Sequence, residues 1–300
     1  MTCGCGHCTI QVTLDNGLQG LIKHAQAGFA AGARIVTGPG TPSDAWRPDA
    51  IDGWLDELAP DAVINLAHYH QQFQLVTADA EQMAAQRQFS ERLIESCAQR
   101  DMLLCMLSNT RVFSGEKNTP YTEKDELTPV GAQGAVQAAL DQLLARRCKR
   151  HLLLRFSWLL DQSPDGLLMR LVNQLQASQR VALAEEWRGN PTPLADAARV
   201  LLAVIKQMDC DAELYGVYHY ASVEASSWIS LAKSLGQELL SLERLAEDPI
   251  IEPVNYADQP AAQFEPQNAA LNGRRLLFAF GIKPRAWRAG LDDILQPPAA

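Results

Sequence analysis

The chain has 300 residues, enough to bury a full hydrophobic core as one large domain or two modest ones. Its formal net charge of −9 disfavours nucleic acid or an anionic membrane as a partner, because either would need a basic face. No apolar run reaches the roughly 18–20 residues that span a bilayer. The N-terminus lacks the basic and apolar regions of a signal peptide, so we expect a cytoplasmic protein.

The N-terminus carries a cluster of soft metal ligands, namely Cys3, Cys5, His7 and Cys8. Such side chains can hold zinc or copper, but structural zinc sites usually pair two knuckles that are well separated in sequence. We therefore predict no metal centre and interpret this segment as a leader before the first strand, with a metal or redox role as the alternative. The other cysteines are expected to be reduced, partly buried thiols. They are Cys97, Cys105, Cys148 and Cys210.

Strand and helix signals alternate through the first half of the chain. Runs rich in β-branched or apolar residues predict strands at 9–14, 34–37, 61–67, 102–107 and 151–155. Helical patterns lie between them, at 18–31, 51–58, 78–100 and 134–146. The run at 61–67 is nearly continuous in apolar residues, as in a strand that is buried on both faces. The alternation predicts an α/β fold with a doubly wound parallel sheet of the Rossmann type.

After Trp158 the pattern changes to helices at 167–178, 194–208 and 227–235, joined by loops that contain Pro and Gly. We predict a smaller C-terminal lobe beside the carboxyl ends of the strands, where open α/β sheets place ligands. The predicted division is 1–160 with about 192–218 for a dinucleotide-binding-type domain, and about 161–191 with 219–300 for a smaller substrate-binding-type lobe.

Several strings carry a family resemblance through their shared order. They are PDAVINLA at 60–67, PYTEKD at 120–125, RFSW at 155–158, GNPT at 189–192, GVYH at 216–219 and NAAL at 268–271. Together they resemble the dTDP-4-dehydrorhamnose reductases, a branch of the extended short-chain dehydrogenases. The resemblance implies a Rossmann domain for NADP(H) or NAD(H), and a second lobe that holds a keto-sugar linked to a nucleotide.

The resemblance places the family's phosphate-binding turn, TGxxGxxG, on residues 13–20, which read TLDNGLQG. The first glycine is replaced by Leu14, whose branched side chain crowds the turn, and Asp15 adds a negative charge beside the pyrophosphate. We therefore expect NADP or NAD binding to be weak or absent. The cofactor-binding residues that the resemblance implies are Thr13, Gly17, Gly20, Ala67 and Ser108.

The resemblance assigns the family's catalytic tyrosine, and the lysine four residues later, to Gln133 and Gln137. A glutamine amide does not titrate near neutral pH, so Gln133 cannot hand a proton to an alkoxide. Gln137 carries no charge with which to lower the pKa of a neighbour. The helper hydroxyl of the family string STDYVFDG falls on Asn109. Three positions are replaced together, and we predict that reduction by the family's mechanism is lost.

Other residues are considered as substitutes for the missing acid. Tyr121 with Lys124 lies in the loop before a predicted helix, and His68 and His70 follow a predicted strand end. No nucleophile elbow, P-loop or HExxH string offers a second chemistry.

The predicted second lobe keeps part of the family's substrate pocket. The resemblance assigns substrate contacts to Trp158, Trp187, Asn190 and Thr192, although Trp187 is equally interpreted as an aromatic at the rim. Glu265 stands where the family tends to carry an arginine that faces the nucleotide's phosphates. This reversed charge predicts a different ligand.

We favour a protein that has lost reductase activity and acts as a binding or regulatory protein, with a nucleotide, a sugar nucleotide or a protein as its partner. The first alternative is an active NAD(P)H-dependent sugar-nucleotide oxidoreductase with unorthodox catalytic residues. The second is a structural component that uses its cysteine-rich leader as a metal or redox handle. A homodimer is left open.

Overall fold

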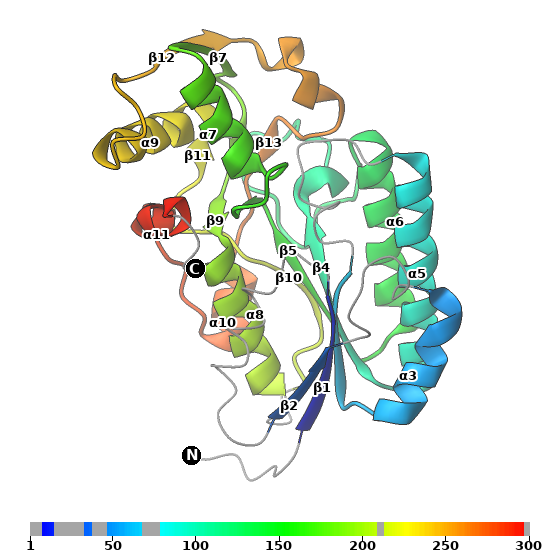
Figure 1. Cartoon of the computed structure of the whole chain (residues 1–300). Helices are drawn as coiled ribbons and strands as arrows, with labels where there is room; N and C mark the ends of the chain where they lie inside the picture. Colours follow the sequence, from blue (N-terminus) through cyan, green and yellow to red (C-terminus); the bar gives the residue numbers. More distant parts are fainter. Residues whose placement is uncertain (1–7, 15–32, 38–46, 68–78, 209–212, 297–300) are drawn as a thin grey trace.

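A computed structural model describes residues 8–14, 33–37, 47–67, 79–208 and 213–296 of the chain. Its centre is a six-stranded parallel sheet with the strand order β10-β5-β4-β3-β1-β2 (Figure 1). The order reverses its direction between β1 and β3, which is where open α/β sheets form a ligand crevice. The strands are β1 (Cys8–Leu14), β2 (Ala33–Thr37), β3 (Ala62–Leu66), β4 (Leu103–Asn109), β5 (His151–Phe156) and β10 (Gly216–His219). The predicted α/β fold with a doubly wound sheet is confirmed.

Helices cover both faces of this sheet (Figure 1). On one face lie α3 (Ile51–Leu58), α5 (Ala80–Gln99) and α6 (Gly131–Arg147). On the other lie α8 (Leu194–Met208) and α10 (Arg274–Phe280). Because side chains alternate along a strand, β3, β4 and β5 supply residues to both layers, which explains the nearly continuous apolar runs. Ile64, Cys105 and Leu154 pack with α8 and α10, whereas Val63, Leu104 and Leu153 pack with α3, α5 and α6.

A second core is built around three buried tryptophans, Trp158, Trp187 and Trp228, whose ring centroids lie 4.5–5.4 Å apart. Helices and short strands surround it, above the sheet in Figure 1. The helices are α7 (Leu167–Ala177), α9 (Trp228–Ser241) and α11 (Leu291–Leu295). The strand groups are β6 (Trp158–Leu160) with β9 (Pro191–Pro193), β7 (Arg180–Ala184) with β12 (Ile250–Val254), and β8 (Arg188–Gly189) with β11 (Ser226–Ser227) and β13 (Asn268–Ala269).

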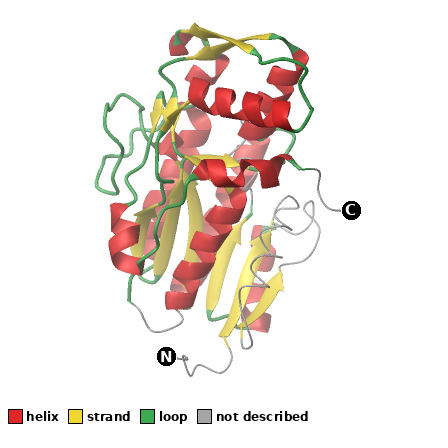
Figure 2. Ribbon diagram, turned by 90° about the vertical axis from the view of Figure 1, so that its left-hand side faces the viewer, coloured by secondary structure: helices red, strands yellow, loops and turns green. Residues whose placement is uncertain are grey.

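Loops connect the two cores (Figure 2). The short 3₁₀ helices are η2 (Pro48–Ala50), η3 (Thr110–Val112), η4 (Tyr256–Asp258), η5 (Pro260–Gln263) and η6 (Trp287–Gly290). The helix predicted at 18–31 lies outside the described residues. Within the described ranges, no helix combines the length and the apolar composition needed to cross a bilayer.

Some features differ from the predictions, among them one edge strand and one helix. The edge strand β10 has four residues, and its periodicity was too short to indicate a strand. Helix α10 belongs by sequence to the predicted smaller lobe, yet its Leu276 and Phe280 pack in the core of the sheet.

The described residues include three of the four cysteines that lie beyond the N-terminal cluster. Cys97, Cys105 and Cys148 are free and buried, as expected. Burial raises the pKa of the Cys105 thiol to about 12 and that of Cys148 to about 11.

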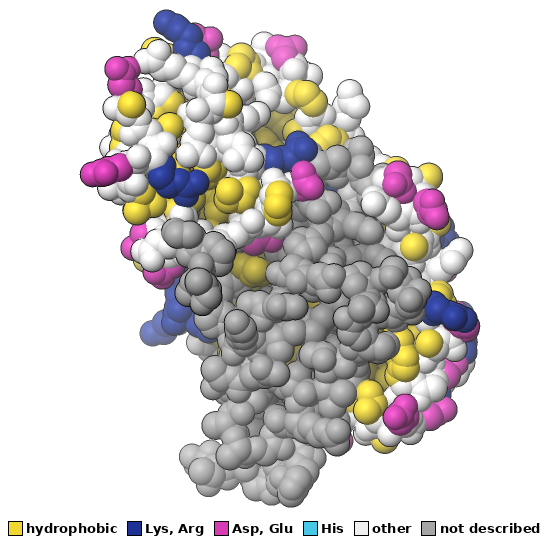
Figure 3. Space-filling view, in the orientation of Figure 1, with side chains coloured by type: hydrophobic (Ala, Val, Ile, Leu, Met, Phe, Trp, Pro, Cys, Tyr) yellow, Lys and Arg dark blue, Asp and Glu magenta, His cyan; other side chains and the backbone are white. Residues whose placement is uncertain are grey.

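On the face shown in Figure 3, the basic and acidic side chains of the described residues are interspersed and form no continuous basic patch.

Candidate ligand site

The candidate site lies where the carboxyl ends of β4 and β5 meet the first turns of α6. Ser108 and Asn109 end β4, and Gln133 and Gln137 lie four residues apart on α6. This helix packs closely against η3, since a Cβ at Gly134 would lie 2.4 Å from the carbonyl oxygen of Arg111. The structure therefore brings together all three positions that the resemblance assigned to catalysis.

A buried ion pair between Asp141 of α6 and Arg155 of β5 organises the inner part of the site. The Asp141 Oδ2 atom lies 2.6 Å from Arg155 Nη2 and accepts a hydrogen bond of 2.6 Å from Ser108 Oγ. Gln137 Nε2 donates to Asp141 Oδ1 at 2.8 Å and approaches the Leu107 carbonyl at 3.4 Å. The predicted site residues Ser108 and Gln137 are thus both engaged by one carboxylate.

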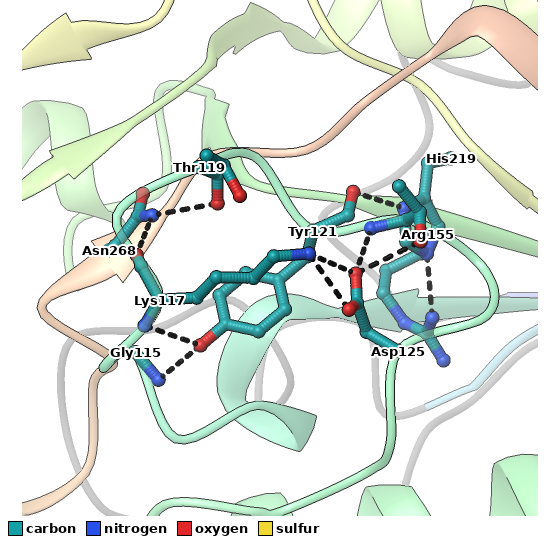
Figure 4. A network of polar contacts seen from close by, with 9 residues as sticks. Gly115, Lys117, Thr119, Tyr121, Asp125, Arg155, His219 and Asn268 are labelled. Carbon is teal, nitrogen blue, oxygen red and sulfur yellow. Dashed lines mark hydrogen bonds and ion pairs between the residues drawn. The ribbon is translucent and has the colours of Figure 1, made fainter.

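His219 of β10 extends this network to the loop that contains Tyr121 (Figure 4). His219 Nε2 lies 2.7 Å from Arg155 Nη1, and Nδ1 lies 3.1 Å from the Tyr121 carbonyl oxygen. Because a guanidinium only donates and a carbonyl only accepts, the imidazole is the neutral tautomer with its proton on Nδ1. Burial, together with the Arg155 charge, holds the pKa of His219 well below its ordinary value.

A second buried ion pair, between Arg111 and Glu265, covers the outer part of the site. Arg111 Nη2 and Nε lie 2.5 and 2.6 Å from Glu265 Oε1, and the two side chains are 3% and 8% exposed. Arg111 Nη1 also donates to Gln133 Oε1 at 2.6 Å. Burial raises the pKa of Glu265, and the guanidinium beside it opposes that rise. The reversed charge at Glu265 therefore has a partner inside the protein.

Among the described residues, two amide atoms of this site find no hydrogen-bond partner. They are Gln133 Nε2 and Gln137 Oε1, and the two residues are 4% and 1% exposed. A buried polar group that makes no hydrogen bond costs roughly 1–3 kcal/mol.

Tyr121, considered as a substitute acid, anchors a loop in the structure. Its hydroxyl oxygen accepts from the backbone N–H groups of Gly115 at 2.9 Å and Lys117 at 3.4 Å (Figure 4). The lysine over its ring is Lys117, with Nζ 5.5 Å from the ring centroid, whereas Lys124 is exposed. Asp125 binds the Lys117 ammonium at 2.8 Å. These contacts are those of a structural tyrosine.

The predicted substrate residues take up packing and backbone contacts. Trp158 and Trp187 are 2% and 3% exposed, so Trp187 is a core residue and not the rim aromatic that was considered. Gly189 is needed beside Trp158, since a Cβ there would lie 2.4 Å from the indole ring. Asn190 Oδ1 accepts from the Leu271 N–H at 2.8 Å, and Thr192 Oγ1 donates to the Asn190 carbonyl at 3.2 Å. Their predicted role in binding stays a prediction.

The predicted cofactor residues fall only partly within the described chain. Thr13 on β1 is paired with Asn65 on β3, and the Ala67 N–H donates to Asn65 Oδ1 at 3.1 Å. Gly17, Gly20, His68 and His70 lie outside the described residues.

The cysteine cluster is likewise only partly described. Cys3, Cys5 and His7 lie outside the described residues, while Cys8 begins β1. Elsewhere in the described chain, no group of three or more His, Cys, Asp or Glu side chains could hold a metal ion.

The pairing of Arg111 with Glu265 and the role of Asp141 were not predicted from the sequence. A signal was present, because Arg111 replaces the tyrosine of STDYVFDG and Glu265 replaces a family arginine. Two altered charges of opposite sign, 154 positions apart, are what an internal ion pair would produce.

Comparison with known proteins establishes the family of this chain. Residues 14–299 match the family described as "RmlD substrate binding domain". The chain belongs to this family. Among its curated relatives, the dTDP-4-dehydrorhamnose reductase of Aggregatibacter actinomycetemcomitans is 23% identical over 252 residues, covering 84% of this chain and 86% of the relative. That of Sinorhizobium fredii is 24% identical over 284 residues, covering 93% of each protein.

Solved structures of RmlD-type proteins share the fold. The dTDP-4-dehydrorhamnose reductase of Clostridium acetobutylicum superposes with a TM-score of 0.78 at 22% identity, covering 96% of this chain and 98% of that one. The Bacillus anthracis reductase, solved in complex with NADP, gives a TM-score of 0.75 at 17% identity with the same coverage. The recognition of a dTDP-4-dehydrorhamnose reductase-like protein from its strings is thus confirmed.

Proposed function

We propose that this RmlD-family protein has lost reductase activity and acts by binding a nucleotide or sugar nucleotide, in a regulatory role. The proposal depends on one observation, namely which residues stand at the two positions assigned to the catalytic tyrosine and lysine and what they contact. Both are glutamines, and each amide is held by a buried ion pair, Gln133 by Arg111 with Glu265 and Gln137 by Asp141 with Arg155.

Reduction of a ketone needs a hydride at the carbon and a proton at the oxygen. A bound NADP(H) would supply the hydride, and the protein must supply the proton. An amide does not release a proton at neutral pH, and a guanidinium stays protonated. The free atoms of Gln133 and Gln137 can hydrogen-bond a ribose, so these residues fit the binding of a dinucleotide but not proton delivery.

One observation favours the alternative, an active oxidoreductase with an unorthodox acid. Glu265 is a buried carboxyl group whose pKa is raised, and Arg111 joins it to Gln133. A general acid needs a pKa near the working pH, and a raised carboxyl pKa moves toward it. The ion pair with Arg111 argues against this role, because it stabilises the deprotonated form.

The decisive experiment supplies purified protein with NADPH or NADH and dTDP-4-dehydrorhamnose, and follows nicotinamide absorbance. We expect no oxidation of the nicotinamide above a protein-free control, and none in Gln133→Tyr with Gln137→Lys, because the altered turn at Leu14 and Asp15 still disfavours the cofactor. Steady turnover by the wild type that disappears in Glu265→Gln would establish the alternative.

Binding is measured separately by thermal denaturation with dTDP, dTDP-glucose and NADH. A ligand at 100 times its Kd stabilises the folded state by about 2.7 kcal/mol. We expect at least one of these ligands to raise the melting temperature. The cytoplasmic location and the two-lobe division remain predictions, and a protein partner and a homodimer are left open.

A further inference from the structure

A cavity of about 270 Å³ lies beside α10, apart from the two buried ion pairs of the candidate site. Its described walls come from the segment that follows β10, from residues 271–274 leading into α10, and from Asn190 between β8 and β9. No member of either buried ion pair lines it. A ligand held in this cavity therefore contacts neither pair.

Two asparagines supply the cavity with free hydrogen-bond donors. Asn190 Oδ1 accepts from the Leu271 N–H at 2.8 Å, and Asn272 Oδ1 accepts from the Arg274 N–H at 3.0 Å. Because a backbone N–H fixes each amide oxygen, each Nδ2 is the end that remains. Neither Nδ2 atom has a hydrogen-bond partner among the described residues, and Asn190 is only 3% exposed. Both residues line the cavity, so these donors are available to a ligand.

Arg274 carries the only charge among the described residues that line the cavity. Its guanidinium forms no ion pair within the described part of the chain. Tyr220 also lines the cavity, but its hydroxyl donates to Asp196, and Arg199 Nε binds the same carboxylate at 2.7 Å. The Asp196 charge is thus compensated inside the protein, and the cavity keeps one positive charge.

Most of the other lining side chains are apolar. Leu271, Leu277 and Ile282 line the cavity, together with Val223, which is 57% exposed. A ligand that covers these side chains removes apolar surface from water, which favours binding. The cavity therefore combines free donors and one positive charge with an apolar wall, as small-molecule sites commonly do.

We propose that this cavity binds a small monocarboxylate with an aliphatic tail. The carboxylate accepts from the Arg274 guanidinium and from Asn190 Nδ2. The tail packs against Leu277 and Ile282. A guanidinium presents two parallel N–H groups that match the two oxygens of a carboxylate.

The charge of the cavity favours a carboxylate over a phosphate. One unpaired positive charge balances a single negative charge, whereas a phosphate monoester carries about −1.5 to −2 charges at pH 7. This inference goes beyond the proposed function, because it adds a second ligand site to the nucleotide site.

Four probes separate the charge of the ligand from its apolar tail. Hexanoate carries both features, and 1-hexanol keeps the tail without the charge. Hexylamine reverses the charge, and acetate keeps the charge with a minimal tail. Binding of each probe to the full chain is measured by calorimetry.

Arg274→Met removes the positive charge, and Arg275→Met is its matched control. Arg275 is the next residue of α10, but its Cζ atom lies 4.7 Å from the ring centroid of Tyr218 and it does not line the cavity. Asn190→Asp is a second variant, which keeps an oxygen for the Leu271 N–H and replaces the free donor by another oxygen. Melting temperatures confirm that each variant is folded.

We expect hexanoate to bind more tightly than the other three probes. It should bind about tenfold more weakly to Arg274→Met and to Asn190→Asp, the order expected for a hydrogen bond to a charged group, and equally well to Arg275→Met. The inference is overturned if the wild type does not bind hexanoate or binds 1-hexanol equally well. An equal loss in Arg274→Met and Arg275→Met also overturns it.

The same variant keeps this inference distinct from the proposed function. Arg274 lies outside the candidate site, so Arg274→Met should bind dTDP-glucose or NADH as the wild type does. If the wild type binds hexanoate but no nucleotide, the proposed function fails and the carboxylate site stands. If it binds a nucleotide but no hexanoate, the proposed function stands and the carboxylate site fails.

Discussion

Two neighbouring regions of this protein use their polar side chains differently. In the first, the anchored loop of residues 115–125, side chains bind backbone in addition to the half-buried Lys117–Asp125 pair: the Tyr121 hydroxyl accepts from Gly115 and Lys117, and Asn268 Nδ2 donates to the Lys117 and Thr119 carbonyls at 2.5 and 3.2 Å. In the second, the amide face of Gln133 and Gln137, side chains bind other side chains through buried ion pairs, and two amide atoms have no partner in the part of the chain that the structure describes.

The difference separates what holds the fold from what performs chemistry. The strings that match the RmlD family, such as PYTEKD and GNPT, contain Tyr121 and Asn190, whose contacts tie loops to the rest of the chain. The positions that do not match include Asn109, Gln133 and Gln137, which the resemblance assigned to catalysis. A protein that keeps the first group and loses the second retains the scaffold, which supports the proposed binding role.

Arg155 is linked to both regions through Asp141 and His219, so its substitution should decrease the free energy of unfolding the most. Arg155→Met leaves the Asp141 carboxylate buried without its cation and takes the donor away from His219 Nε2. Breaking one side of a buried pair typically costs about 3–5 kcal/mol. We expect a decrease of this order in the free energy of unfolding, measured by urea denaturation.

A double variant tests whether the loss of stability comes from the Asp141 carboxylate, which is left buried without its cation. Arg155→Met combined with Asp141→Leu removes both charges and should be more stable than Arg155→Met alone. If the double variant is as unstable as the sum of the two single variants, the two charges are not coupled and the network is wrongly described.

Tyr121→Phe affects only the anchored loop and sharpens the comparison. The substitution keeps the stack on Phe113, whose ring centroid lies 4.2 Å away, but leaves the Gly115 N–H without its acceptor. We expect about 1–3 kcal/mol of destabilisation, the cost of an unsatisfied buried donor, measured by thermal or urea unfolding. Affinity for dTDP-glucose or NADH should not change, and a change would mean that the two regions are not separate.

The smallest expected effect is a pH dependence at the junction of the two regions. The pKa of His219 in the folded protein lies well below 6.5. As the pH falls below about 6.5, this histidine is therefore protonated in the unfolded chain but stays neutral in the folded chain. Stability is therefore intact above about pH 6.5 and decreases below it, by up to about 1.4 kcal/mol per pH unit.

His219→Gln removes the ionisable group, so its stability should fall less steeply between pH 7 and 5. The pKa of His151 is also lowered, chiefly by burial, and that group titrates in both proteins. The difference in slope between wild type and variant therefore isolates His219. Equal slopes would contradict the neutral, buried imidazole inferred from its hydrogen bonds.

Prediction from sequence succeeded where the signal is local. The predicted strand at 61–67 corresponds to β3, and the predicted helix at 194–208 coincides with α8, because periodicity reports burial over a short window. It missed β10 and the two-residue strands β8, β11 and β13, which are too short to show a period and exist because of their neighbours.

The sequence by itself determined the fold class and the absence of a titratable pair at 133 and 137, since the identity of a residue at a motif position is a property of the chain alone. Only the tertiary structure decided what those glutamines do. Arg111 and Glu265 are 154 positions apart, and their pairing depends on which segments the folded chain brings together. That pairing orients one amide, Asp141 orients the other, and the free donor and acceptor follow from the two contacts.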